Sequence, residues 1–256
     1  MRILITNDDG IHAPGLAVLQ KIAAELSDDV WTIAPETEQS GASHSLTLHD
    51  PLRLREVEER VYAVQGTPTD CVIMGVRHLL LDQPPDLVLS GVNAGQNMAD
   101  DVTYSGTIAG AFEGNLLGIP SIALSLAYSF DKDKTRKLKW QTPLALGSDI
   151  VRRLLDAGWP QDAVLNVNFP DREPDDVAGV VVTDQGRRNT DALTIEDRMD
   201  TRGNPYYWLG FKRRKSTPKE GSDLWAVFTG RISVTPLNLN LTHNNAMKNL
   251  ASALDE

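Results

Sequence analysis

A strand, a helix and a second strand follow one another within the first 34 residues of the chain. The apolar run at residues 3–5 ends in polar residues and a glycine, which is typical of a buried strand. Residues 14–26 begin with a proline suited to a first helical turn and place their apolar residues along one face, so we expect a helix there. A second apolar run, residues 30–34, stops at Pro35. Two strands joined by a helix in this way form a right-handed parallel crossover, the unit of a doubly wound sheet.

The same alternation continues to about residue 125. Further strands are expected at residues 61–64, 86–90 and 121–125, and further helices at residues 68–81 and 105–117. Strands and helices that alternate along a chain indicate an α/β fold, with a mostly parallel sheet and helices on both faces.

Beyond about residue 130 the pattern is weaker. We expect a charged loop or helix start at 131–139, a helix at 143–155, a strand at 163–169, hairpins or an arm within 180–236, and a helix at 242–254. The basic stretch 212–215 is expected to be an exposed loop, with a phosphate contact in a neighbouring subunit as the alternative. The whole chain, residues 1–256, is expected to form one domain, with a core to about residue 180 and an oligomerisation extension from about 181 to 256.

Composition and charge limit the cellular locations and the binding partners that we expect for this protein. No segment approaches the roughly 18 to 20 consecutive apolar residues of a membrane span, so no membrane partner is expected. The single cysteine, Cys71, excludes an intramolecular disulfide framework and a cysteine-based zinc cluster, and a cytoplasmic location is the simplest interpretation. The formal net charge of −10 disfavours binding to a nucleic-acid polymer. An anionic substrate would therefore need a site that carries its own positive charge.

Three polar loops follow strands of the expected sheet. Asp8 and Asp9 follow the first strand, Ser40 lies in the loop after the second, and Asn93 follows the strand at 86–90. The carboxyl ends of parallel strands lie at one edge of a sheet, where ligands collect. Carboxylate, hydroxyl and amide oxygens suit a hard cation such as Mg²⁺, Mn²⁺ or Ca²⁺. Adjacent strand residues point to opposite faces, so both carboxylates can face the cleft only if the chain has left the strand, which Gly10 makes easy.

Each of these motifs also has a purely structural interpretation. An Asn-Asp-Asp-Gly tetrapeptide is by itself more often a turn with capping acids; its position beside the Ser40 and Asn93 loops favours metal binding. Ser105, Gly106 and Thr107 precede a helix and form either an anion site or an ordinary N-cap, and the Asn97 amide lies just upstream. For the nearby histidines, His12 and His44, a turn or capping role is at least as plausible as catalysis.

Five segments in this order carry a resemblance to a known family. They are ILITNDDGIHAPG (residues 3–15), APETEQSGASHSLT (34–47), GTPTDCV (66–72), SGVNAGQN (90–97) and YSGTIAGAFEG (104–114). On these segments the chain resembles the SurE (survival protein E) family of nucleotidases, over most of its length and most densely over the first 125 residues.

The resemblance implies a Rossmann-like core and one divalent metal ion per subunit, Mg²⁺, Mn²⁺ or Ca²⁺. It implies metal ligands at Asp8, Asp9, Ser40 and Asn93, with Asp8 and Asp9 as the catalytic residues. Phosphate contacts are implied at Asn97, Ser105, Gly106 and Thr107. The implied activity is that of a phosphomonoesterase on nucleoside 5′-monophosphates, and also on 3′-nucleotides and short polyphosphate in some members. A homodimer or homotetramer that exchanges C-terminal elements is implied too; Asn240 stands where that pattern has an aspartate.

Two chemical routes and two other protein classes fit parts of this pattern. The metal would activate a water, or Asp8 or Asp9 would accept the proton or attack phosphorus to give an aspartyl phosphate. A haloacid-dehalogenase-type phosphatase needs two aspartates separated by one residue, whereas Asp8 and Asp9 are adjacent. A receiver-like, non-enzymatic signalling module needs an acceptor aspartate at the end of a later strand, where this chain has Ser90 to Asn93.

Overall fold

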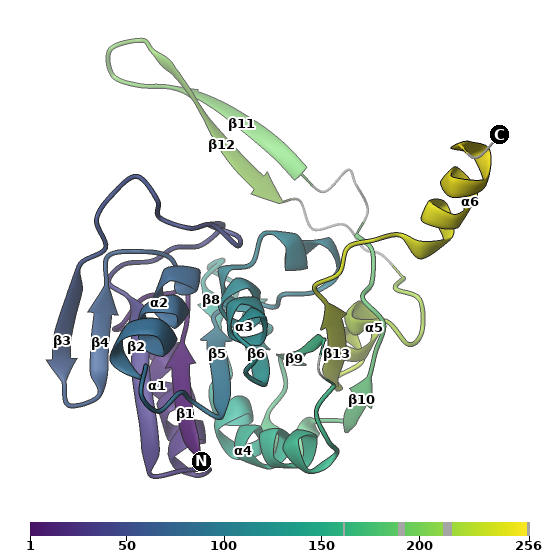
Figure 1. Ribbon diagram of the computed structural model, residues 1–256. Helices are drawn as coiled ribbons and strands as arrows, with labels where there is room; N and C mark the ends of the chain where they lie inside the picture. The colour runs from purple at the N-terminus through teal and green to yellow at the C-terminus, as the bar shows by residue number, and fades with distance from the viewer. Residues whose placement is uncertain (161, 189–192, 212–216, 255–256) are drawn as a thin grey trace.

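The computed structural model describes residues 1–160, 162–188, 193–211 and 217–254, and Figure 1 shows their arrangement. At the centre lies a nine-stranded sheet in the order β10-β13-β9-β6-β5-β1-β2-β4-β3. Its strands are β1 (Arg2–Thr6), β2 (Asp29–Pro35), β3 (Leu54–Glu58), β4 (Val61–Val64), β5 (Leu87–Asn93), β6 (Ser121–Leu126), β9 (Ala163–Phe169), β10 (Val180–Val182) and β13 (Ile232–Asn238). Two antiparallel pairs lie outside it, β7 (Ser129–Phe130) with β8 (Arg136–Lys137) and β11 (Leu193–Met199) with β12 (Pro205–Phe211). The helices are α1 (Pro14–Ala24), α2 (Pro68–Met74), α3 (Gly106–Leu116), α4 (Gln141–Asp156), α5 (Asp223–Phe228) and α6 (Asn244–Leu254).

The centre of the sheet is parallel. Every pair from β9 through β6, β5, β1 and β2 to β4 runs in the same direction. Antiparallel pairing occurs toward the ends of the sheet, where β3 pairs with β4 and β13 pairs with β9. The predicted α/β fold with a mostly parallel, Rossmann-like sheet is therefore confirmed.

Helices cover both faces of this sheet because successive apolar side chains of a strand point to opposite faces. Ile3 and Ile5 of β1 pack with Leu19 of α1 and Ile150 of α4. Leu4, between them, points to the opposite face and packs in the cluster that contains Val72 of α2. The first helix begins at Pro14, as its proline predicts, and α2 begins with a capping box in which Thr67 and Asp70 bond each other's backbone N–H groups.

The direction of chain progression reverses at β1. From β1 the chain moves outward through β2 to β4, and then returns to place β5 on the other side of β1. The crevice between the carboxyl ends of β1 and β5 is thus the switch point at which open α/β sheets bind their ligands. Asp8 and Asp9 follow one of these two strands and Asn93 ends the other.

Several expected elements differ in detail. The charged run at 131–139 was expected as a loop or helix start, yet it contains β8, because the Asp131 carboxylate accepts hydrogen bonds from the backbone N–H groups of Asp133 and Thr135 and so turns the chain into a short hairpin. The helix expected at 68–81 is α-helical only to Met74 and continues as a π-helical turn at Gly75–Leu79. The strand expected to end at Ser90 continues as β5 to Asn93.

The residues beyond 180 are divided between the sheet and two projecting elements. β10 and β13 lie within the nine-stranded sheet, and α5 packs against β13. The β11–β12 hairpin and α6 extend away from the body of the molecule (Figure 1). Large apolar side chains on these two elements are exposed: Ile195, Met199, Tyr206, Tyr207, Trp208, Leu209, Met247, Leu250 and Leu254. The expected basic loop at 212–215 lies outside the described residues. Among the residues that are described, no helix combines the length and apolar character that a membrane span needs.

Candidate active site

The turn after β1 places two carboxylates at the switch point. Gly10 has φ +99°, a left-handed conformation that glycine adopts at little cost, and the Asn7 side chain closes the turn by donating to the Gly10 carbonyl oxygen at 2.9 Å. Asp8 is only 4% exposed, and Asp9 is half-buried. The chain has therefore left the strand at these residues, as the sequence predicts for two adjacent carboxylates that face one cleft.

The N-terminus of α3 closes against Asp8. Thr107 Oγ1 donates a 2.5 Å hydrogen bond to Asp8 Oδ1. A Cβ atom on Gly106 would lie 2.8 Å from Asp8 Cβ and 3.1 Å from Asp8 Oδ2, so a larger residue would separate the helix from the carboxylate. The absence of a Cβ atom at Gly106 therefore lets α3 approach Asp8 closely.

The two neighbouring loops also contact the aspartates. The backbone N–H of Gln39, beside Ser40, donates to the Asp8 carbonyl oxygen at 2.7 Å. The backbone N–H of Ala94, beside Asn93, donates to Asp9 Oδ2 at 3.0 Å. The segments that carry Ser40 and Asn93 are therefore each hydrogen-bonded to the turn that carries Asp8 and Asp9.

Burial makes both carboxylates hard to ionise. Burial raises the pKa of Asp8 to about 6, and the negative charge of Asp9 adds to this effect, whereas the Thr107 hydrogen bond opposes it. Burial also raises the pKa of Asp9 and the charge of Glu38 adds to this effect, whereas the Ala94 hydrogen bond and the positive charge of Arg136 oppose it. Within the described residues, no Lys, Arg or His forms an ion pair with either carboxylate.

The donor set fits a hard cation. The Asn93 amide nitrogen donates to the Gly95 carbonyl oxygen at 2.8 Å, so the amide oxygen is the atom left for a cation. The Ser40 hydroxyl donates to Glu38 Oε1 at 2.8 Å and retains its lone pairs. No cluster of three or more His, Cys, Asp or Glu with metal-binding spacing occurs in the described part of the chain, so a site here is one of two carboxylates completed by hydroxyl and amide oxygens. A bound dication would relieve the repulsion between Asp8 and Asp9.

The predicted phosphate contacts are only partly free to bind a phosphate. Ser105 is the N-cap of α3, where its hydroxyl oxygen accepts from the backbone N–H of Ile108 at 3.1 Å. The Thr107 hydroxyl donates to Asp8, so its side chain supports a predicted metal ligand. Asn97 donates from its side-chain amide to Ser125 Oγ at 2.9 Å. The backbone N–H of Thr107 also bonds the Asp8 carboxylate. The backbone N–H groups of Ser105 and Gly106, at the start of α3, are therefore the donors that this geometry offers to an anion.

Comparisons with known proteins identify the family. The family model described as "Survival protein SurE" matches residues 3–192. A curated protein of Parvibaculum lavamentivorans named "5′-nucleotidase SurE" is 57% identical over 254 residues, which cover 99% of this chain and 91% of that protein. The chain belongs to the SurE family.

Further SurE proteins match over their full length. The "5′-nucleotidase SurE" of Azorhizobium caulinodans is 59% identical over 256 residues, which cover 100% of this chain and 99% of that one. The crystal structure of the SurE protein from Aquifex aeolicus is 39% identical, with a TM-score of 0.84, and covers 100% of both chains. The family predicted from the five segments is confirmed.

The SurE fold also brings in polar residues that the motifs do not mark. Asn166 and Asn168 of β9 are fully buried, and both donate to the Asn97 carbonyl oxygen, at 2.8 and 3.1 Å. The sequence does carry a signal for these residues. They are two asparagines at alternate positions of the otherwise apolar segment 163–169, and buried amides need polar partners.

Two of the histidines have structural contacts. His44 Nε2 lies 3.0 Å from Glu113 Oε2 of α3 and holds the loop that carries Ser40 against that helix. His243 Nδ1 accepts from the backbone N–H of Ala246 in the first turn of α6. Asn240 Oδ1 likewise accepts from the backbone N–H of Thr242.

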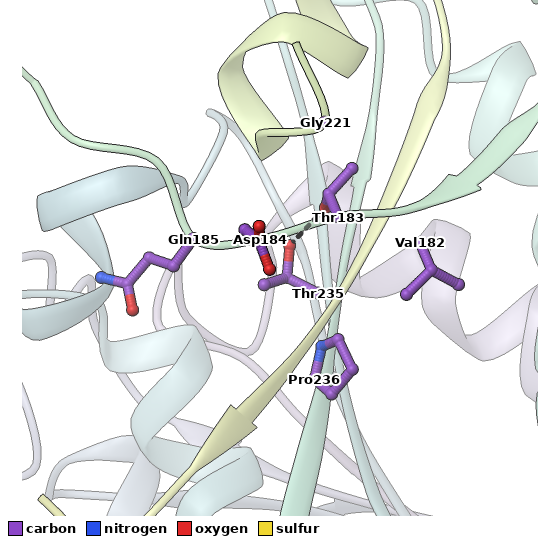
Figure 2. A pocket seen from close by; sticks show the side chains of 7 residues that line it. All are labelled: Val182, Thr183, Asp184, Gln185, Gly221, Thr235 and Pro236. Atoms are coloured by element: carbon purple, nitrogen blue, oxygen red, sulfur yellow. Dashed lines mark hydrogen bonds between the residues drawn. The ribbon is translucent and has the colours of Figure 1, made fainter. Parts of the chain in front are cut away.

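A separate hollow lies beside β10 and β13, at a distance along the sheet from β1. Figure 2 shows its lining, in which Thr183 is hydrogen-bonded to Thr235 and Gln185 points away from that pair. Its volume is about 450 Å³, and Asp184 is the only charged side chain among its described lining residues. None of the predicted site residues is among those lining residues.

Proposed function

We propose that this protein is a metal-dependent 5′-nucleotidase, which hydrolyses a nucleoside 5′-monophosphate to a nucleoside and phosphate. Relatives at 57% and 59% identity over nearly the whole chain carry that name. The observation that carries the proposal is the meeting of Asp8 and Asp9 with the Ser40 loop, the Asn93 loop and the N-terminus of α3. The receiver-like alternative has no support from these relatives.

Each side chain then has a definite task. Asp8, Asp9, Ser40 and Asn93 hold one divalent cation, Mg²⁺, Mn²⁺ or Ca²⁺, since their oxygens suit hard cations. When bound, the cation supplies charge neutralisation at the phosphate and a lower pKa for a coordinated water. The backbone N–H groups at Ser105 and Gly106 orient the phosphate oxygens at the helix N-terminus, while Thr107 supports Asp8 and Asn97 borders the same space. In a protein of net charge −10, this local positive potential is what admits an anionic substrate.

The exposed apolar residues of the β11–β12 hairpin and α6 support an oligomer. Large apolar side chains gathered on projecting elements are usually covered by another protein surface. A homodimer or homotetramer that exchanges these C-terminal elements would cover it. We place the enzyme in the cytoplasm, with nucleoside monophosphates rather than nucleic-acid polymers or membranes as its partners.

Release of inorganic phosphate from AMP and GMP, measured with and without EDTA, tests the proposed function. We expect turnover with added Mg²⁺ or Mn²⁺ and loss of nearly all of it in EDTA, with recovery when excess metal is returned. Parallel reactions with 3′-AMP and with tripolyphosphate measure the wider activities that the family resemblance implies. Hydrolysis of AMP that is indifferent to EDTA, or no hydrolysis with any of these metals, would rule the proposal out.

The Thr107→Val variant separates support of the metal ligand from phosphate binding. Valine keeps the shape but removes the hydroxyl that donates to Asp8. We expect the metal concentration for half-maximal activity to rise by roughly 10-fold to 100-fold, as for other groups that orient metal ligands. The KM for AMP at saturating metal should change little, and Thr107→Ser should restore the metal response. A raised KM with an unchanged metal response would instead assign the hydroxyl to the phosphate.

A further inference from the structure

The segment from Asn97 to Ser105 joins two of the proposed phosphate contacts. Its middle is the 3₁₀-helix Ala99–Thr103, preceded by the buried Met98. Ala99 has φ +53°, a left-handed conformation that a residue with a Cβ adopts only at an energetic cost. The surroundings of the 97–105 segment must therefore hold it in this shape.

Asn168 holds the first residue of the segment by its backbone. The Asn97 N–H donates to Asn168 Oδ1 at 2.8 Å, and Asn168 Nδ2 donates to the Asn97 carbonyl oxygen at 3.1 Å. Asn166 Nδ2 donates to the same carbonyl oxygen at 2.8 Å. The side chain of Asn97 is fixed as well, because its amide donates to Ser125 Oγ. Ser125 is fully buried, as are both asparagines of β9, so protein groups rather than bulk water satisfy these bonds.

Asp223 holds the middle of the segment. Its carboxylate is fully buried and accepts from the backbone N–H groups of Ala99 at 2.8 Å, Gly186 at 2.9 Å and Leu224 at 2.7 Å. Gln185 Nε2 donates to the Ala99 carbonyl oxygen at 2.9 Å, so both backbone groups of Ala99 are bonded by residues far away in the sequence.

Arg188 adds a third attachment further along the segment. Its guanidinium Nε lies 2.8 Å from Asp101 Oδ1, and its backbone N–H donates to Asp100 Oδ2 at 2.6 Å. Gln185 and Arg188, which follow β10, therefore bond the 97–105 segment at Ala99, Asp100 and Asp101.

Burying polar groups of this kind costs free energy of folding, so their hydrogen bonds indicate a structural or functional role. A carboxylate or amide removed from water loses hydration that only well-placed hydrogen bonds replace. Asn168 and Asp223 use their bonds on the backbone of the 97–105 segment, across 71 and 124 residues of sequence. Fixed donors beside a reacting phosphate need no reorganisation when the substrate binds.

We propose that Asn168 and Asp223 are positioning residues that hold the 97–105 segment in the shape that receives the substrate phosphate. The inference rests on the proposed function and adds two residues, from β9 and from the start of α5, that touch neither the metal ligands nor the substrate. It assigns to Asn166 and Ser125 a supporting part in the same arrangement.

Two variants test this with little change in shape. Asp223→Asn keeps one acceptor oxygen for Gly186 and Leu224, but turns an amide nitrogen toward the Ala99 N–H, so that bond is lost. Asn168→Asp keeps the acceptor for the Asn97 N–H and loses the donor to its carbonyl oxygen. Thr183→Val is the control, because Thr183 is also buried and its hydroxyl is hydrogen-bonded to Ser233 and Thr235 of β13 instead of to the segment. Figure 2 shows its bond with Thr235.

The measurements are kcat and KM for AMP, inhibition by inorganic phosphate, the metal response, and Tm. For Asp223→Asn and Asn168→Asp we expect KM and the inhibition constant for phosphate to rise together by about 10-fold to 100-fold, the range that a misplaced donor to a charged group costs. The metal response should stay as in the wild type. Thr183→Val should lower Tm without moving either constant. Folded variants with wild-type KM and phosphate inhibition, or an equal change in Thr183→Val, would overturn the proposal.

Equilibrium binding of inorganic phosphate to the full chain, by calorimetry in the presence of Mg²⁺, separates this inference from the proposed function. If the wild type fails to hydrolyse AMP yet binds phosphate, weaker binding by both variants still supports the positioning role. If the wild type hydrolyses AMP and the two variants bind phosphate as tightly as it does, the positioning role fails while the proposed function stands.

Discussion

Replacing Asp8 by asparagine is expected to lower kcat/KM for AMP by about 10³-fold or more. Asparagine keeps the shape of the side chain and still accepts the Thr107 hydrogen bond, but it has no charge with which to hold a dication. A bound metal supplies several kcal/mol of charge stabilisation in the transition state, and each 1.36 kcal/mol corresponds to about tenfold in rate.

The same substitution should stabilise the metal-free protein above neutral pH. The pKa of Asp8 is raised from 3.8 to about 6 in the folded chain, so the folded form binds the proton more tightly than the unfolded form. The resulting stability is complete below about pH 4 and is lost as the pH rises through about 6. At pH 8 the ionised, buried carboxylate costs the fold on the order of 3 kcal/mol, which Asp8→Asn removes. Added Mg²⁺ should raise the Tm of the wild type and leave that of the variant unchanged.

Steady-state kinetics and thermal unfolding, each with and without metal, check both parts of this prediction. Asp28→Asn is the matched control, since Asp28 is an exposed aspartate before β2, at the opposite end of the sheet. It should leave activity and the metal response unchanged. An Asp8→Asn enzyme with near-normal turnover would show that Asp8 does not hold the metal.

Replacing Gly15 by alanine is expected to destabilise the protein by about 3 kcal/mol or more, the upper range for overpacking. A Cβ atom on Gly15 would lie 1.9 Å from the carbonyl oxygen of Val92, an atom of the β5 backbone that has no rotamer to change. Helix α1 and the end of β5 would have to separate. Because Val92 precedes Asn93, this proposed metal ligand would be displaced as well, and activity should fall with stability.

Gly147→Ala is the matched control for this prediction. Gly147 also lies on a helix packed against its neighbours, but a Cβ there meets Ile22 Cδ1 at 2.7 Å, the flexible end of a side chain. Alanine also favours the helix over glycine by about 1 kcal/mol, so we expect a net change within about 1 kcal/mol. Urea unfolding curves with a common slope measure both variants. Equal midpoints for the two would contradict the close approach of α1 to β5.

Much of the fold follows from local patterns in the sequence. The positions of β4 and β9 agree with the expected strands at 61–64 and 163–169, because short apolar runs between polar turns have few alternatives. The C-terminal third was less predictable. β13 carries Thr235 and Pro236 and lies between β9 and β10, a place that depends on pairing with strands distant in the sequence. The short helix α5 has too few residues for a periodic signal.

The sequence by itself determined the family and which loops meet at the sheet edge. The alternation of strands and helices makes the sheet parallel, and parallel strands bring Asp8, Asp9, Ser40 and Asn93 to the same end. No local pattern determines which distant side chain completes a given hydrogen bond.

Only the tertiary structure decided that Thr107 bonds Asp8, that Asn168 bonds the backbone of Asn97, and that Asp223 bonds that of Ala99. These partners lie 99, 71 and 124 residues apart in the chain. These polar groups bond one another because they are buried, where water cannot satisfy their hydrogen-bonding capacity. Burial is a property of the packed molecule rather than of any segment of its sequence.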